Sequence, residues 1–247
     1  MCTSLASIVA AAVAYLLGSV PFGYIAGRLR GVDIRTVGSG NIGATNVFRT
    51  LGKGPGATVF LLDAAKGAVA VAALPALAAA ASNLSWHAAP NAWVRIACAI
   101  FVLLGHTFPV FLNFKGGKGV ATGLGVAFGL VPHSAALGLS VWVALFLATR
   151  YVSVASIVAA LIVAAAPWVI DAPAAGSGTT ADYAILAAVS ALGVLVALKH
   201  RSNVRRLLSG TENRFCFTAR QLAEREARTD RQASDANPSS PSGKALK

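Results

Sequence analysis

The chain has 247 residues, of which 56% are hydrophobic and only 12% are charged. Soluble domains carry roughly 25% charged residues, so this composition excludes an ordinary soluble protein. The formal net charge of +12 would suit a nucleic-acid-binding protein, but about half of the 21 Lys and Arg residues lie from Lys199 onward, directly after an apolar segment. Basic residues beside a membrane span set its orientation and meet anionic lipid. Because no zinc-finger spacing or aromatic-interleaved basic face is present, we expect no nucleic-acid partner.

Apolar segments along the chain predict an all-α, polytopic membrane helix bundle of about seven transmembrane helices. We place the spans at residues 4–27, 56–80, 92–112, 119–131, 133–149, 151–170 and 182–199. Crossing about 30 Å of hydrocarbon takes roughly 20 residues, so the segment 119–131 is too short to cross comfortably. A re-entrant segment is the alternative there. The first segment lacks the positive flank of a signal peptide, and we interpret it as a retained span.

The loops between these spans alternate in charge. The first, third and fifth loops and the C-terminal region carry Lys or Arg, whereas the second, fourth and sixth loops carry neither. The positive-inside rule therefore predicts that the N-terminus lies outside and the C-terminus lies in the cytoplasm. Arg95, near the outer end of the third span, is the exception, and we expect it to snorkel to the interface.

Composition divides the chain into a membrane domain, residues 1–214, and a basic cytoplasmic tail, residues 215–247. The stretch 231–247 is rich in Ser, Pro and charge, which predicts disorder, and a short surface helix is expected over 215–228. The three cysteines form no CxxC pair, so neither a disulfide framework nor a zinc site is expected.

The first dense polar cluster lies in residues 37–49. It contains glycines, small polar side chains and an arginine: Gly38, Ser39, Gly40, Asn41 and Arg49. Such glycines expose backbone N–H groups, and an arginine offers a planar fork suited to phosphate. We expect an oxyanion cradle here, with a flexible helix-capping loop as the alternative. The G-x-G-x-x-G spacing is no dinucleotide fingerprint, because membrane helices flank it in place of a βαβ unit.

The second cluster is a lysine- and glycine-rich turn that leads into an apolar helix. It consists of Lys115, Gly116, Gly117 and Lys118. Helix N-termini and free amides attract anions, so we expect this turn to bind phosphate. It is not a P-loop, because Gly119 stands where Ser or Thr should follow the lysine. Two ordinary positive-inside lysines are the alternative. His106, upstream of the turn, is expected to be a packed histidine.

The third cluster follows the last span. His200 and Asn203 are three residues apart and share a helical face. Histidine is the side chain best suited to exchange a proton near neutral pH, and the alternative is a basic juxtamembrane stop.

Two smaller polar features lie within the spans. Asp63 and Lys66, three residues apart, predict a structural ion pair that faces the bundle, because unpaired charges in a bilayer are costly. Ser153 and Ser156 share a face at the start of the sixth span, where they either reach a cytoplasmic cavity or cap the helix.

Taken in order, four segments resemble a known family. They are VGSGNIGATNVFR (37–49), GHTFPVFLNFKGGKGVAT (105–122), RYVSVASI (150–157) and HRSNVRRLLSGTENR (200–214). The chain resembles the bacterial acyl-phosphate:glycerol-3-phosphate acyltransferases, the PlsY family, over about residues 11–214. The resemblance implies a multi-pass enzyme of the cell inner membrane with its active site at the cytoplasmic face. The enzyme would transfer a fatty acyl group from acyl phosphate to the sn-1 hydroxyl of glycerol 3-phosphate.

The resemblance also implies roles for individual residues. His200, Ser39, Arg49 and Asn203 correspond to catalytic positions, Lys118 and Ser156 to substrate positions, and Glu212 to a structural position. No cofactor and no metal are expected. The implied partners are acyl phosphate, glycerol 3-phosphate, the lipid bilayer and, by functional link, an enzyme that produces acyl phosphate. Acyl phosphates are already activated, so our hypothesis is direct transfer, with His200 or a substrate phosphate oxygen receiving the proton.

Two further patterns bear on alternative functions. The residue five after each histidine is Ala92, Phe111, Gly138 or Arg205. None is acidic, so the usual acyltransferase His-and-Asp pair is absent. A membrane transporter of a phosphorylated metabolite is the alternative, because glycine-broken helices and cations would serve it equally well. The gathering of polar motifs at one predicted face favours the enzyme.

Overall fold

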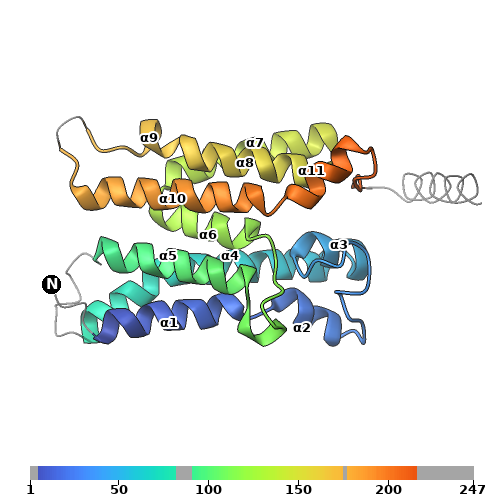
Figure 1. Ribbon diagram of the computed structural model, residues 1–247, viewed down its shortest axis with the longest axis horizontal. Helices are drawn as coiled ribbons and strands as arrows, with labels where there is room; N and C mark the ends of the chain where they lie inside the picture. Colours follow the sequence, from blue (N-terminus) through green and yellow to red (C-terminus); the bar gives the residue numbers. More distant parts are fainter. Residues whose placement is uncertain (1–4, 82–90, 175–176, 216–247) are drawn as a thin grey trace, which may run out of the picture.

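A computed structural model of the chain describes residues 5–81, 91–174 and 177–215, and over these ranges the protein is an all-helical bundle without strands (Figure 1). The described elements are α1 (Leu5–Ser19), α2 (Phe22–Arg28), α3 (Ala44–Leu51), α4 (Lys53–Ala81), α5 (Ala92–Thr107), the 3-10 helix η1 (Val110–Leu112), α6 (Val120–Leu130), α7 (Pro132–Thr149), α8 (Val152–Ala165), α9 (Pro167–Ile170), α10 (Thr180–Leu198) and α11 (Arg201–Leu208). The predicted all-α membrane bundle is confirmed.

Six described segments are long and apolar enough to cross a bilayer. They are Leu5–Arg28, Lys53–Ala80, Ala92–Leu112, Pro132–Thr149, Val152–Ile170 and Thr180–Leu198. The remaining apolar helix, α6, has 11 residues. At 1.5 Å per residue it is about 17 Å long, which is short of the roughly 30 Å hydrocarbon thickness. The segment that the sequence marked as too short is therefore short in the structure as well.

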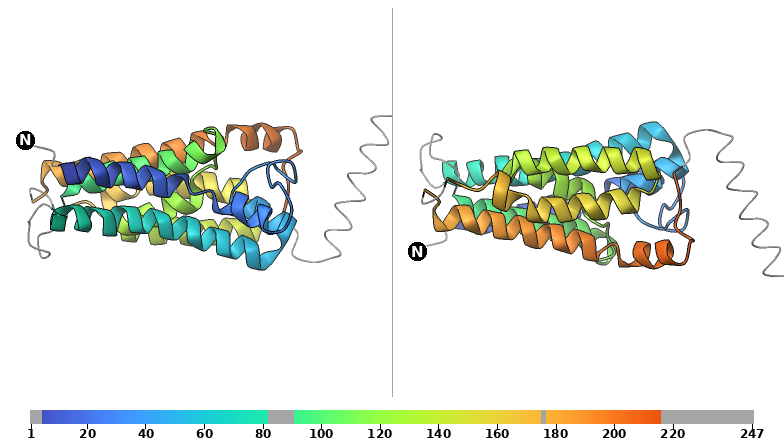
Figure 2. Two further views of the ribbon diagram at one scale, coloured as in Figure 1. Left: turned by 90° about the horizontal axis from the view of Figure 1, so that it is seen from below. Right: turned by 90° about the horizontal axis from the view of Figure 1, so that it is seen from above.

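The short helix α6 lies between two groups of longer helices (Figures 1 and 2). On one side α1, α4 and α5 pack around a core of small residues and valines, and on the other side α7, α8 and α10 pack together. Glycines bring α6 against α4: a Cβ atom at Gly125 would lie 1.9 Å from the carbonyl oxygen of Ala64. Inside a lipid bilayer the hydrophobic effect does not drive helices together, and small residues instead let the helix backbones approach closely and pack. These close contacts fix the short helix α6 within the bundle.

The loops that carry basic residues all lie at one end of the bundle, which we call the polar end. It comprises residues 29–43, 108–119, 150–151 and 199–215, and α1 begins at the opposite end (Figure 1). This grouping is what the alternation of loop charge requires. Every segment of the candidate site belongs to this end or to the helices that lead to it.

Arg95 corrects the sequence-based expectation, because it does not extend to the interface. Its Nε donates to the carbonyl oxygen of Val71 at 3.3 Å, and an Nη group donates to that of Gly129. Pro75 lacks the N–H that would otherwise bind the Val71 carbonyl, and Gly129 belongs to the last turn of α6, whose carbonyls lack helical partners. Arg95 thus satisfies two backbone acceptors, one on α4 and one on α6.

Asp63 and Lys66 face the interior of the bundle together with His106. Lys66 Nζ lies 2.6 Å from Asp63 Oδ1 and donates to the carbonyl oxygen of Val20 at 3.0 Å, at the break between α1 and α2. His106 Nδ1 lies 3.6 Å from the same carboxylate oxygen. All three side chains are buried. We call Asp63, Lys66 and His106 the inner charged cluster.

The packed chain continues past the boundary drawn from the sequence at residue 214. Phe215 is buried, and its ring lies against those of Phe48 at 5.1 Å and Phe146 at 5.3 Å. Its backbone N–H donates to the carbonyl oxygen of Arg150 at 2.8 Å. Phe215 therefore belongs with the bundle. Residues 216–247, to which the predicted disorder and most of the predicted surface helix refer, lie outside the described residues.

Candidate active site

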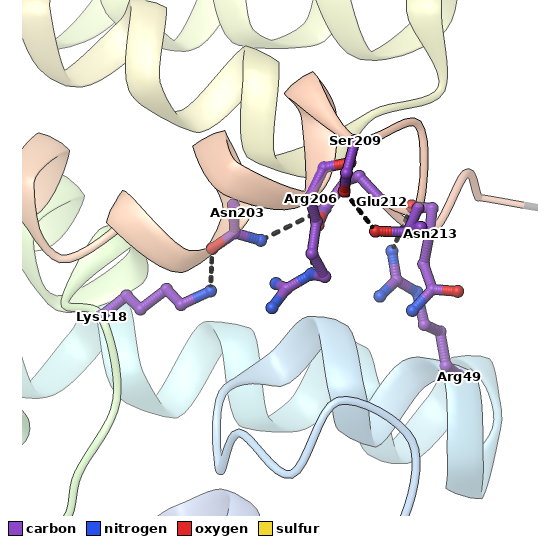
Figure 3. A network of polar contacts seen from close by, with 8 residues as sticks. Arg49, Lys118, Asn203, Arg206, Ser209, Glu212 and Asn213 are labelled. Carbon is purple, nitrogen blue, oxygen red and sulfur yellow. Dashed lines mark hydrogen bonds and ion pairs between the residues drawn. The ribbon is translucent and has the colours of Figure 1, made fainter.

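A chain of charged hydrogen bonds crosses the polar end. Lys118 Nζ donates to Asn203 Oδ1, Asn203 Nδ2 donates to Glu212 Oε1 at 2.7 Å, and Arg206 Nε donates to Glu212 Oε2 at 2.7 Å (Figure 3). Arg49, on α3, donates from an Nη group to the carbonyl oxygen of Asn213 at 3.1 Å. We call Arg49, Lys118, Asn203, Arg206 and Glu212 the polar cluster. It joins three segments that are far apart in the sequence.

The short helix α11 supplies the centre of this cluster. His200, Asn203 and Arg206 are spaced by three residues, so they lie along one helical face. The helix ends before Gly210, whose φ of 70° reverses the chain. The backbone N–H of Glu212 then donates to the carbonyl oxygen of Arg206 at 3.1 Å. This reversal returns the Glu212 carboxylate to the face that carries Asn203 and Arg206.

The glycines before Lys118 shape the turn that positions it. The N–H groups of Gly116 and Gly117 donate to the carbonyl oxygens of Thr107 and His106 at 3.2 and 3.0 Å, and these carbonyls end α5. A Cβ atom at Gly117 would lie 2.2 Å from His106 Nε2, so a side chain does not fit there. The two amides are thus engaged in the turn, and Lys118 carries its positive charge towards α11.

The electrostatic environment of Lys118 differs from that of an ordinary lysine. Burial, together with the positive charge of Arg206, lowers the pKa of Lys118 to about 8. For Glu212, burial acts to raise the pKa, but hydrogen bonds from Asn203 and Arg206 outweigh it and the net pKa is lowered. Near neutral pH the cluster therefore holds an ionised carboxylate among protonated cations.

Buried Asn46 organises the first polar loop. Its Oδ1 accepts from the N–H of Ser39 at 2.9 Å, and its Nδ2 donates to the carbonyl oxygens of Ile34 and Val37, each at 3.0 Å. Gly38 has a φ of 61°, and a Cβ atom there would lie 2.2 Å from Asn46 Oδ1. The loop is thus a fixed turn rather than a flexible one.

The predicted donors of this loop divide between the turn and the surface. The N–H of Gly40 donates to the carbonyl oxygen of Val37 at 3.0 Å, and Asn41 Oδ1 accepts from the N–H of Gly43 at 2.8 Å. The side chain of Ser39 is exposed at the polar end. The loop therefore presents the Ser39 hydroxyl, while several of its amides stabilise the turn.

His200 lies at the start of α11 and is buried. Its Nδ1 is 2.8 Å from the carbonyl oxygen of Val196, which only accepts, so Nδ1 carries the proton and Nε2 is left as an acceptor. Burial lowers the pKa of His200 to about 4, so the ring is neutral near pH 7. A neutral imidazole with a free Nε2 lone pair is the form that accepts a hydrogen bond from a hydroxyl.

An apolar groove lies among α6, α7, α8 and α10. Val120 and Val196 line the end of the groove that is nearer the polar end, and they are close in sequence to Lys118 and His200. Deeper in the groove lie Ala127, Val163 and Val189. Ser156 is a polar group on its wall, and its Oγ accepts from Trp142 Nε1 at 3.0 Å. The apolar groove therefore reaches the polar end at Val120, close in the chain to Lys118, and at Val196, whose carbonyl oxygen accepts from His200.

The structure brings together most of the residues singled out from the sequence. Arg49, Lys118, His200, Asn203 and Glu212 meet at the polar end, whereas Ser39 and Lys115 are exposed in its loops and Ser156 lies in the groove. Sequence reasoning did not single out Arg206. Its position three residues after Asn203, on the face already identified, is the signal that would have found it.

Comparisons with known proteins identify the family to which the chain belongs. Residues 8–210 match the family model described as glycerol-3-phosphate acyltransferase. A glycerol-3-phosphate acyltransferase of Aquifex aeolicus is 45% identical over 202 residues, which cover 82% of this chain and 95% of the relative. One of Synechococcus sp. (strain CC9902) is 44% identical over 212 residues, which cover 85% of this chain and 96% of the relative.

Solved structures give the same result. The crystal structure of PlsY, an integral membrane glycerol 3-phosphate acyltransferase, in its glycerol 3-phosphate form matches with a TM-score of 0.70 and 42% identity, over 85% of this chain and 96% of that chain. The lysophosphatidic acid form of PlsY matches with a TM-score of 0.69 and 41% identity, over 85% and 95% of the two chains. The resemblance drawn from the four motifs is confirmed, and this multi-pass membrane protein belongs to the glycerol-3-phosphate acyltransferase family.

Proposed function

We propose that the protein transfers a fatty acyl group from acyl phosphate to the sn-1 hydroxyl of glycerol 3-phosphate, giving 1-acylglycerol 3-phosphate (lysophosphatidate) and inorganic phosphate. One observation carries the proposal: an apolar groove reaches the polar end at Val120, which follows Lys118 closely in the chain, and at Val196, whose carbonyl oxygen accepts from His200. An acyl phosphate has the same two parts, a hydrocarbon chain and a phosphate. The glycerol 3-phosphate and lysophosphatidic acid forms of the similar PlsY structures support the acceptor and the product.

The reaction needs no enzyme nucleophile. The sn-1 hydroxyl oxygen attacks the acyl carbonyl carbon, the new ester bond forms, and the bond from that carbon to the phosphate oxygen breaks. Phosphate leaves with the bonding electron pair, and Arg49 and Lys118 stabilise its charge. Holding the two substrates side by side supplies much of the acceleration.

His200 is proposed to orient the attacking hydroxyl. Its neutral ring offers Nε2 as the acceptor, while the Val196 carbonyl fixes the ring through Nδ1. The hydroxyl proton goes to Nε2 or to a phosphate oxygen of the substrate as the ester forms. We assign two further residues to the reaction: Ser39, which the first polar loop presents at the polar end, and Asn203, which accepts a hydrogen bond from Lys118.

The charge of the loops supports a cytoplasmic location for the site. The basic loops lie together at the polar end, so the positive-inside rule favours a cytoplasmic polar end and an N-terminus outside, in the cell inner membrane. Seven crossings would include α6. Because the proposed donor is acyl phosphate, an enzyme that joins phosphate to an acyl group must supply it.

A donor comparison tests the proposal. Purified protein is incubated with glycerol 3-phosphate and either acyl phosphate or acyl-CoA of the same chain length, and lysophosphatidate is measured by mass spectrometry. We expect product from acyl phosphate, with loss of that product in Ser39→Ala and Arg49→Ala. Product from acyl-CoA alone would overturn the donor assignment. Uptake of glycerol 3-phosphate into vesicles without chemical change would favour the transporter.

A further inference from the structure

Arg206 is a third cation of the polar cluster, beside Arg49 and Lys118. In Figure 3 its guanidinium lies between the Lys118 ammonium and the Arg49 guanidinium, in the space between α11 and α3. Its Nε is taken by Glu212 Oε2 at 2.7 Å. Within the described part of the chain, its Nη groups donate no hydrogen bond, and its side chain is 38% exposed. The two Nη groups of the guanidinium therefore point into the space between α11 and α3.

The polar cluster carries more positive than negative charge. Among the described residues, the cluster contains three cations, Arg49, Lys118 and Arg206, and one carboxylate, that of Glu212. That carboxylate is already engaged, because Oε1 accepts from Asn203 and Oε2 accepts from Arg206. Cations gathered in this way repel one another, and the lowered pKa of Lys118 reflects burial together with the charge of Arg206. An anionic ligand would relieve this repulsion.

We propose that Arg206 is a substrate-binding residue whose Nη groups bind a phosphate oxygen of a bound phosphomonoester, while its Nε stays on Glu212. The inference rests on the proposed function and extends it. Each phosphomonoester carries roughly −1.5 to −2 charges near pH 7, so two phosphorylated substrates bring more negative charge than Arg49 and Lys118 balance alone. Glu212 then acts as a positioning residue, since its hydrogen bond to Nε fixes the rotamer of Arg206.

The competing explanation is that Arg206 only anchors Glu212 and the chain that follows α11. The two explanations differ in what Arg206→Lys should do. A lysine keeps the positive charge and the ion pair with Glu212, but a single ammonium lacks the fork that holds a carboxylate and a phosphate together. An anchoring residue would tolerate this change, whereas a substrate-binding residue would not.

Inorganic phosphate is the probe, because it competes for a phosphate site whichever substrate uses it. Its dissociation constant is measured by thermal stabilisation of the purified protein, which does not depend on turnover. We expect Arg206→Lys to weaken phosphate binding about fivefold or more, and Arg206→Gln tenfold or more. Arg205→Gln is the matched control: it removes the same charge from the next residue of α11, whose side chain is exposed, and we expect a change under twofold.

The KM values of glycerol 3-phosphate and acyl phosphate then identify which substrate contacts Arg206, since only that KM should rise. Phosphate binding unchanged in Arg206→Lys would overturn the proposal. An equal loss of phosphate binding in Arg205→Gln would also overturn it, because the effect would then come from long-range electrostatics and not from direct contact. If Arg206→Gln does not fold, Arg206→Lys decides alone. A wild-type protein that binds phosphate but makes no lysophosphatidate would contradict the proposed function and leave the test of Arg206 intact.

Discussion

The inner charged cluster and the polar cluster use the same kinds of side chain with different charge balance. Inside the bundle, Lys66 faces Asp63 at 2.6 Å, and its remaining hydrogen bond goes to a backbone carbonyl, so one cation meets one anion. At the polar end, the described residues place three cations, Arg49, Lys118 and Arg206, in one cluster with the carboxylate of Glu212, which Arg206 binds directly. Buried charge alone therefore does not mark a substrate site. A cluster in which positive charges outnumber negative charges is the better indication of a site for an anionic substrate.

This contrast has an energetic basis. A buried charge is tolerated when a partner compensates it, and removing one partner leaves the other uncompensated. The inner charged cluster is complete in itself, so its substitution should change stability. The polar cluster is complete only with an anion, so its substitution should change substrate binding and turnover.

The largest effect is expected from Asp63→Asn, which leaves Lys66 without a counter-charge. Removing one member of a buried ion pair costs about 3–5 kcal/mol, so we expect a large drop in thermal stability. The double variant Asp63→Asn/Lys66→Met should recover part of the loss, because the stranded charge is removed as well. Thermal unfolding of the purified variants checks this. A single variant as stable as the wild type would break the distinction between the two clusters.

Lys118→Met should have the next largest effect, and it should act on catalysis instead of stability. Removing one donor that stabilises developing charge lowers kcat by about 100- to 1000-fold. Stability should be retained, because Lys118 is one of several cations around Glu212. Lysophosphatidate formation and thermal unfolding are measured together. Lys53→Met, at the exposed start of α4, is the control for loss of one basic residue at the polar end. A full rate with reduced stability would assign Lys118 to structure.

How far the sequence predicts this arrangement differs between fold and site. Periodic apolar segments predict the helices, because a bilayer leaves few alternatives for a backbone. Motif residues such as Lys118, His200 and Asn203 are recognisable by residue type and spacing. Arg95 was misjudged because its partners are carbonyls on α4 and α6, which no local pattern reveals. The internal use of the Gly116 and Gly117 amides likewise depends on the end of α5, which the turn meets only in the fold.

The apolar groove extends the comparison from charge to hydrocarbon. Gly123 lines the groove, and a Cβ atom there would make ordinary contacts with Val196 at 3.7 Å and Leu103 at 4.0 Å. A larger side chain should therefore fit the helix and fill the groove. Each buried CH₂ contributes about 0.8 kcal/mol, so Gly123→Leu, by displacing two methylene groups, should lower kcat/KM for long acyl phosphates roughly 15-fold.

Chain length provides the control for this substitution. A short acyl phosphate that does not reach past Gly123 should keep nearly its wild-type kcat/KM in Gly123→Leu. The ratio of long-chain to short-chain kcat/KM is the measurement. Equal loss for both chain lengths would indicate damage to the polar cluster, and no loss for either would place the acyl chain elsewhere.

The smallest effect expected is a pH dependence that arises from Lys118. Its pKa is lowered to about 8, so the ammonium is present below pH 8 and is lost as the pH rises through that value. The charged groups that face Lys118 are Arg206, Glu212, Arg49 and Lys199, and neutral His200, with its pKa lowered to about 4, adds no inflection near 6.5. We therefore expect kcat/KM to fall above pH 8, about tenfold for each pH unit, with no step between pH 5.5 and 7 from His200.

Bound phosphate should raise the pKa of Lys118, so kcat should fall at a higher pH than kcat/KM does. Lys118→Arg, which stays protonated, should lose the alkaline decline even at a lower overall rate. If the decline persists in that variant, it belongs to another group, and Lys118 does not supply the charge that the polar cluster needs.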